Sequence, residues 1–150
     1  MRLIAYLVAA IVLAAISGPA GAHDHRAGDL RITHPWTRAT NGDVTAVYMK
    51  IMNTGSTPDR LLRATTEVGE ATIHESKTES GVAKMRPVES VAIPARKEVS
   101  FQPGGLHIML MGLKQPLTEG FGIPMTLVFE KAGEVHIDAM VQKAGAKPMH

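Results

Sequence analysis

The stretch GLHIMLMG, residues 105–112, alternates in the way that a β-strand requires. Successive strand side chains point to opposite faces, so His107, Met109 and Met111 share one face. The aliphatic residues between them share the other face, which suits a protein core. The stretch therefore predicts a strand that is anchored on one side and that presents one imidazole and two thioethers on the other.

Similar short stretches recur along the chain between turn residues, and no helical pattern interrupts them. About nine strands are expected, at residues 30–38, 43–52, 60–66, 70–75, 90–94, 98–102, 105–112, 125–130 and 134–141. Residues 77–81 are expected to form a polar loop, and residues 83–87 an edge strand or an irregular segment ending at a proline. This spacing predicts an all-β fold, an antiparallel Greek-key β-sandwich over residues 30–141.

The N-terminal residues 1–22 have the layout of a signal peptide. Arg2 precedes an apolar run at 3–16, which is shorter than the roughly 20 residues needed to span a bilayer, and Ala20-Gly21-Ala22 forms a cleavage pattern. We therefore expect export to the periplasm, cleavage after Ala22 and no membrane span in the mature protein. Residues 23–29 and 142–150 are polar and aperiodic, and both are expected to be flexible.

The composition narrows the chemistry that the chain can perform. The 150 residues include nine methionines and no cysteine, which excludes disulfides and thiolate ligands within this chain. The 16 Lys and Arg residues nearly balance the 14 Asp and Glu residues and are scattered, so nucleic acid is not an expected partner.

Two histidines and two methionines lie where several predicted strands can bring them together. His74 ends a predicted strand, Met85 follows the polar loop, and His107 and Met109 lie on the strand at 105–112. Two imidazoles with two thioethers and no carboxylate or thiolate form a donor set that favours Cu(I) over Zn(II), Mg(II) or Ca(II). The residues alone leave an alternative open, because methionine commonly fills cores and histidine is commonly a hydrogen-bonded structural residue.

The spacing His-x10-Met-x21-His-x-Met, met at His74, Met85, His107 and Met109, resembles the signature of the periplasmic copper chaperones of the PCu(A)C family. Flanking stretches are also similar, and the likeness extends from about Ile32 to Glu130. They are Pro35-Trp36, Ala46-Val47-Tyr48, Met85-Arg86-Pro87-Val88-Glu89, Ile93-Pro94-Ala95 and the segment from Pro103 to Leu113.

The resemblance implies a cupredoxin-like β-sandwich that binds one Cu(I) per domain through these four residues. It also implies a role: a periplasmic carrier, not an enzyme, that delivers copper to the copper centres of cytochrome c oxidase, with a separate thiol-disulfide protein reducing the acceptor. We expect a monomer. A protein that sequesters copper for resistance, without a specific acceptor, needs the same site and remains the alternative.

Further histidines and methionines suggest secondary sites. A mature chain that begins His23-Asp24-His25 offers an amine, two amides and an imidazole, a square-planar set that suits Cu(II). Met149-His150, with Met140 and His136, suggests a copper-collecting arm, although His136 is expected to be merely exposed. Met111 is expected to pack beneath the main site rather than bind metal, and Glu75, Arg86 and His34 are expected to be structural or solvated.

Overall fold

A computed structural model describes residues 24–148. The predicted signal peptide, His23 and the final Met149-His150 lie outside the described residues. Within the described range, no helix has the length and apolar character needed to cross a membrane.

The fold is all-β, as predicted, and the described residues contain eleven strands. They are β1 (His25–Ala27), β2 (Leu30–Arg38), β3 (Val44–Asn53), β4 (Asp59–Thr66), β5 (Glu70–Glu79), β6 (Val82–Pro87), β7 (Val91–Ile93), β8 (Glu98–Phe101), β9 (Leu106–Met111), β10 (Gly122–Phe129) and β11 (Gly133–Gln142). All nine expected strands are present close to their expected bounds. Of the two alternatives expected for residues 83–87, the edge strand forms, as β6, and β1 is additional.

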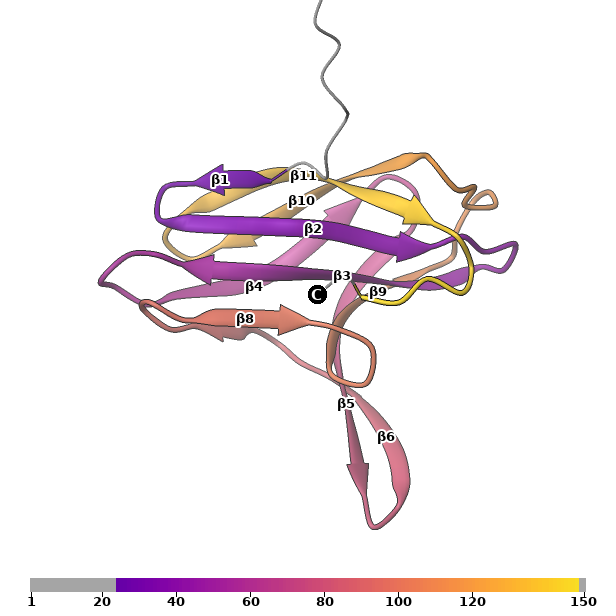
Figure 1. The fold of residues 1–150 in the computed structure, drawn as a ribbon, viewed down its shortest axis with the longest axis horizontal. Helices are drawn as coiled ribbons and strands as arrows, with labels where there is room; N and C mark the ends of the chain where they lie inside the picture. Colours follow the sequence, from indigo (N-terminus) through magenta and orange to yellow (C-terminus); the bar gives the residue numbers. More distant parts are fainter. Residues whose placement is uncertain (1–23, 149–150) are drawn as a thin grey trace, which may run out of the picture.

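The strands form one continuous sheet in the order β6-β5-β9-β8-β3-β2-β11-β10-β4-β7, with β1 paired to β2. This sheet curls so that β4 contacts β5 and β7 contacts β3, which gives the two layers visible in Figure 1. Most pairs are antiparallel as expected, but β11 runs parallel to β2, and β8 meets β9 in parallel at Phe101↔Leu106. Alternation within a strand encodes its two faces and not the direction of its neighbour, so these parallel pairs were not predictable from the pattern.

The core lies between the two layers and receives alternate residues of the central strands. Val47, Met49 and Ile51 of β3 are buried, and Ile108 and Leu110 of β9 are both 0% exposed. The predicted anchoring face of residues 105–112 is therefore confirmed, and the His107 side of β9 faces away from this core.

The expected polar loop at 77–81 is instead part of a long hairpin. β5 continues to Glu79, and Ser80 and Gly81 turn the chain with φ values of 50° and 77°. Two consecutive positive φ values are typical of the two-residue turn that joins twisted strands, which is why the polar residues pair and do not form a loop. The hairpin projects from the layered body as a separate arm (Figure 1).

Both segments expected to be flexible have ordered parts. Residues 25–27 form β1 and pair with β2, in a register that runs from Ala27↔Leu30 to His25↔Ile32. A tight turn at Gly28 lets the chain fold back in this way. In the C-terminal segment, Ala146 is 5% exposed and packs on Trp36 and Tyr48.

Candidate metal centre

The registers of β5, β6 and β9 bring the four predicted ligands to one sheet face. His74 pairs with His107 and Thr72 pairs with Met109 across β5 and β9. Ser76 pairs with Met85 across β5 and β6. Paired residues and residues two apart on a strand point to the same side of a sheet. We refer to this side of the three strands as the ligand face.

The two histidines lie directly opposite one another at the centre of this face. The Ser76 amide donates to the Gly105 carbonyl at 3.1 Å, which makes Ser76 and Gly105 a hydrogen-bonded pair. Such pairs recur at every second residue, so His74 and His107 form the next one. Their rings are 6.0 Å apart between centroids and nearly parallel, at 17°. A metal ion can therefore be approached by both imidazoles after a small rotation of the rings.

The hydrogen bonds of both rings use Nδ1. His107 Nδ1 lies 3.0 Å from the Gly105 carbonyl oxygen. Because a carbonyl can only accept, the proton lies on Nδ1 and the Nε2 lone pair is free for a metal. His74 Nδ1 lies 3.2 Å from Thr72 Oγ1, and donation by the ring to this hydroxyl leaves its Nε2 free in the same way.

The two methionines flank the histidine pair diagonally. Met85 is opposite Ser76 and Met109 is opposite Thr72, so each is the diagonal neighbour of His74 on one side. Diagonal neighbours are separated by about 7–8 Å, a distance that long side chains span. Met109 is half-buried and Met85 is 53% exposed, so the two sulfurs approach from the body and from the arm respectively.

Exposure rises steadily across the ligand face. His107 is 4% exposed, His74 and Met109 are half-buried, and Met85 on the arm is the most exposed of the four. A metal held here would be fixed by a buried imidazole on one side and covered by a single exposed thioether on the other. An open site of this kind permits ligand exchange with another molecule.

The donor set determines which metal fits. Among residues 24–148 no group of three His, Cys, Asp or Glu side chains is placed to hold a metal, so the face lacks a site of the zinc or calcium type. The two thioethers are neutral and polarisable donors. Together with two imidazoles they favour a soft monovalent ion, Cu(I).

The secondary candidates are placed apart from this set. Met111 is half-buried at the far end of the same face, opposite Glu70. Glu75 and Arg86 form a 3.4 Å ion pair on the opposite side of the hairpin. His136 is exposed, as expected, and its Nδ1 is 3.0 Å from Thr126 Oγ1.

Two residues that orient the imidazoles were not predicted from the sequence. Thr72 and Gly105 each lie two positions before the histidine that they contact. On a strand, residues two positions apart point to the same face, so the sequence did indicate that Thr72 could contact His74. The Gly105 carbonyl had none, because a backbone contact depends on the turn before β9.

A further aromatic group continues the ligand face beyond β9. Ala46 of β3 pairs with Met109, and Tyr48, two residues on, therefore shares the face and lies near the level of His107. Tyr48 packs on Trp36, and Arg38 lies 5.6 Å from the Trp36 ring and donates to the Ala146 carbonyl. The C-terminal segment thus covers the sheet beside the buried histidine.

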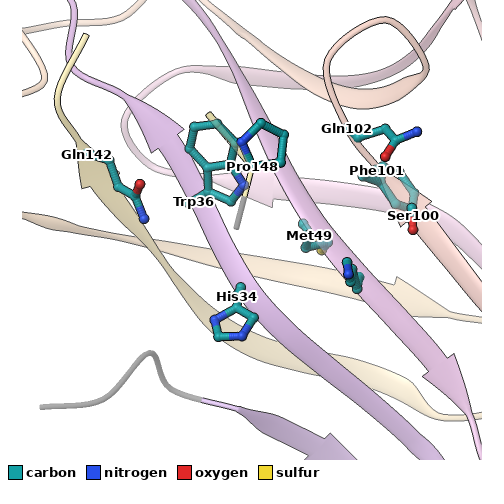
Figure 2. A pocket seen from close by; sticks show the side chains of 9 residues that line it. His34, Trp36, Met49, Ser100, Phe101, Gln102, Gln142 and Pro148 are labelled. Carbon is teal, nitrogen blue, oxygen red and sulfur yellow. The ribbon is translucent and has the colours of Figure 1, made fainter. Parts of the chain in front are cut away.

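A small hollow next to this aromatic group contains none of the predicted ligands. It has a volume of about 30 Å³ and lies between β2, β3, β8 and the C-terminal segment, with Pro148 beside Trp36 (Figure 2). A space of this size holds about one water molecule and no organic ligand. This hollow is therefore not a candidate site for an organic ligand.

Comparisons with known proteins agree with this geometry. The family model described as "Putative lipoprotein LpqE-like" matches residues 30–141. The "Putative lipoprotein Lxx21020" of Leifsonia xyli subsp. xyli (strain CTCB07) is 36% identical over 130 residues, which cover 81% of this chain and 78% of the relative.

Two solved structures are similar over most of the chain. The copper-bound PCuAC domain from PmoF2 is 31% identical with a TM-score of 0.69, covering 81% of this chain and 98% of that domain. The solution structure of CuI-DR1885 from Deinococcus radiodurans is 27% identical with a TM-score of 0.60, covering 85% and 84%. The chain belongs to the LpqE-like family, and it has the cupredoxin-like fold of PCuAC domains, which the resemblance to the PCu(A)C signature implied.

Proposed function

We propose that this protein is a Cu(I) carrier whose site is formed by His74, Met85, His107 and Met109. The observation that carries the proposal is the register of β5, β6 and β9, which places all four side chains on one face. Their softness selects Cu(I). Similarity to a copper-bound PCuAC domain supports copper as the metal. We assign one Cu(I) to each domain.

The proposed transfer is an exchange of ligands without a change in oxidation state. An incoming donor binds the copper as Met85 leaves it, because Met85 is the most exposed ligand and lies on the projecting arm. His107 leaves last, since its ring is buried and fixed by the Gly105 carbonyl. No bond of the protein is made or broken apart from those to copper, so we assign no enzymatic reaction.

For the biological setting we propose the periplasm, with export through residues 1–22, and a monomeric carrier. The family description and the curated relative are both named as lipoproteins, which supports export. As acceptor we propose the copper centres of cytochrome c oxidase, reduced by a separate thiol-disulfide protein. The exposure of Met85 favours a carrier over a sequestering protein, because storage gains nothing from an exposed ligand. Deletion of the gene should reduce oxidase activity at low copper more than survival at high copper.

The copper site itself is tested by titrating the mature apo-protein with Cu(I) in the presence of a competing chelator. The wild type should bind one equivalent tightly, and Met109→Leu and His107→Ala should lose at least tenfold in affinity, as expected when a ligand is removed. Met111→Leu is the matched control, because it changes a methionine of the same strand and face outside the proposed set. Wild-type affinity in both ligand variants would contradict the proposal.

We also propose that the mature N-terminus binds Cu(II) through His23 and His25. His23 lies outside the described residues, whereas His25 lies in β1, where its Nε2 is 3.5 Å from the Asp138 amide. Cu(II) binding through the amine and amides would therefore detach β1 from β2, and we expect this site to be weaker than the Cu(I) site. Mass spectrometry of the secreted protein checks the prediction, since any first residue other than His23 removes the site.

A further inference from the structure

β6 forms one end of the sheet, and its outer edge has no partner strand among the described residues. All six of its residues, Val82–Pro87, are exposed. An unpaired strand edge presents a row of backbone N–H and C=O groups that another extended chain can bind. The edge is notable here because β6 carries Met85.

The hydrogen-bond pattern determines which residues of β6 point outward. Ser76 donates to Gly105 on the β9 side, so its backbone groups turn away from β6. The Val88 amide donates to the Ile73 carbonyl, which puts the bonds between β5 and β6 on the odd-numbered residues of β5. The pair of Ser76 and Met85 is therefore not hydrogen-bonded, and Met85 directs both its N–H and its C=O to the free edge.

The same alternation assigns the rest of the edge. Ala83, two residues before Met85, also points its N–H and C=O outward, whereas Lys84 and Arg86 bond inward to β5. Pro87 has no N–H and ends the row. The free edge thus offers the N–H and C=O groups of Ala83 and Met85 and the C=O group of Pro87.

The two faces of the arm differ sharply in charge. The ligand face carries Ser76, Thr78, Ala83 and Met85 and no charged residue. The opposite face carries Glu75, Lys77 and Glu79 from β5 and two cations, Lys84 and Arg86, from β6. At the edge itself the side chains next to Met85 are both positive. Each already forms an ion pair with a carboxylate of β5, Lys84 with Glu79 at 3.2 Å and Arg86 with Glu75 at 3.4 Å, so an acidic residue of a partner would join an existing pair.

We propose that a copper-exchanging partner docks on this edge as an added antiparallel strand. Its residue opposite Met85 is a soft ligand, a Cys, Met or His, and an acidic residue precedes and follows it. The soft ligand then lies on the ligand face about 5.5 Å from Met85 between Cα atoms, and the acidic residues face Lys84 and Arg86. This inference rests on the proposed Cu(I) site and identifies the structural class of its partner.

A second copy of this chain fits the edge poorly. Antiparallel pairing of β6 with itself around Met85 would place Lys84 of each copy opposite Arg86 of the other. Like charges directly opposite one another destabilise a sheet pair. Charge complementarity therefore favours an acidic segment of a different protein.

The test measures the rate at which the Cu(I)-loaded protein loses copper to a synthetic peptide, Thr-Val-Asp-Cys-Asp-Val-Thr, under anaerobic conditions. In the docked arrangement the Cys amide bonds to the Met85 carbonyl and the flanking Asp amides point away. N-methylation of the Cys should therefore slow transfer about fivefold, the effect of one backbone hydrogen bond, relative to N-methylation of an Asp. Equal rates for the two methylated peptides would overturn the proposal.

Two protein variants test the edge from the other side. Ala83→Pro removes an outward N–H that no strand within residues 24–148 uses, and it should slow transfer about fivefold with unchanged Cu(I) affinity. Ala83→Thr should keep the wild-type rate. Arg86→Glu should slow transfer to the acidic peptide and speed transfer to a peptide with Lys in place of Asp. Lys77→Glu, on β5, is the matched control.

The outcomes separate this inference from the copper site. If the ligand variants retain wild-type Cu(I) affinity, the proposed function fails. If copper binding behaves as proposed but Ala83→Pro and the methylated peptides change nothing, only the docking edge fails. Concentration-dependent dimerisation of the wild type that Ala83→Pro abolishes would assign the edge to a second copy and would also overturn the proposal.

Discussion

Thr72 links the ligands of two strands, β5 and β9, at the atomic scale. Its hydroxyl contacts His74 Nδ1 at 3.2 Å, and across the sheet it pairs with Met109. A metal-binding imidazole needs its second nitrogen held, because a free ring can present the wrong tautomer or rotate away. Thr72 thus affects the geometry of one proposed ligand directly and borders another.

We therefore expect Thr72→Val, which keeps the shape and removes the hydroxyl, to weaken Cu(I) binding about tenfold, at the low end for such outer contacts. Its thermal unfolding midpoint should stay near the wild-type value, since the threonine is only half-buried. Competition with a Cu(I) chelator measures the affinity. Thr78→Val is the control, because Thr78 is on the same strand and face beyond Met85. Equal affinities for the two variants would mean that the hydroxyl does not orient His74.

At the scale of single elements, alternation predicted the body of the sheet well and the arm poorly. On β9 every second residue is aliphatic and His or Met lies between, so the pattern separated Ile108 and Leu110 from the ligand face correctly. The arm has no buried side, and all residues from Lys77 to Pro87 are exposed. Without a buried side there is no hydrophobic period, and only the turn at Ser80-Gly81 indicates a hairpin.

The turn makes the arm sensitive to a single substitution. Gly81 has a φ of 77°, a conformation that costs a residue with a Cβ roughly 1 kcal/mol, although nothing lies within 4 Å of the added atom. Gly81→Ala should accordingly raise the amide hydrogen-exchange rates of the arm about fivefold and leave those of β3 and β9 unchanged.

Gly133→Ala is the matched control for the arm. Gly133 has a similar φ of 73° and equally open surroundings, but it lies in the turn between β10 and β11. Its substitution carries the same backbone strain to the other layer of the fold. Faster exchange in the arm of this variant as well would show that the arm does not open as an independent unit.

At the scale of the whole molecule, the ligands of the candidate site could be predicted from the sequence, whereas the tertiary contacts that support the surrounding structure could not. The resemblance of the four-residue spacing to the PCu(A)C signature implied one site, and the register of the sheet brings the four residues to one face. The order of the C-terminal segment was not predictable, because Ala146 is buried only where Trp36 and Tyr48 of different strands create a place for it. A small residue in a polar stretch carries no signal of such a contact.

Asp59, in the second layer of the fold, is another residue whose tertiary contacts could not be predicted from the sequence. It is 9% exposed and stands at the start of β4. Its carboxylate accepts the amides of Arg60 at 2.7 Å, Lys131 at 2.9 Å and Ala132 at 3.0 Å. One side chain therefore fixes the turn between β10 and β11 against β4, across more than seventy residues of chain.

Asp59→Ala should lower the free energy of unfolding by about 3 kcal/mol, because buried amides lose an ionised acceptor and have no replacement. The Cu(I) affinity of the folded protein should not change, since β5, β6 and β9 lack any contact to this carboxylate. Urea unfolding and chelator competition measure the two quantities.

Glu130→Ala is the control: it removes an exposed 3.9 Å ion pair with Arg60 in the same turn, and such a pair contributes about 0–1 kcal/mol. A loss of copper affinity in Asp59→Ala that Glu130→Ala lacks would mean that the second layer positions the ligand face.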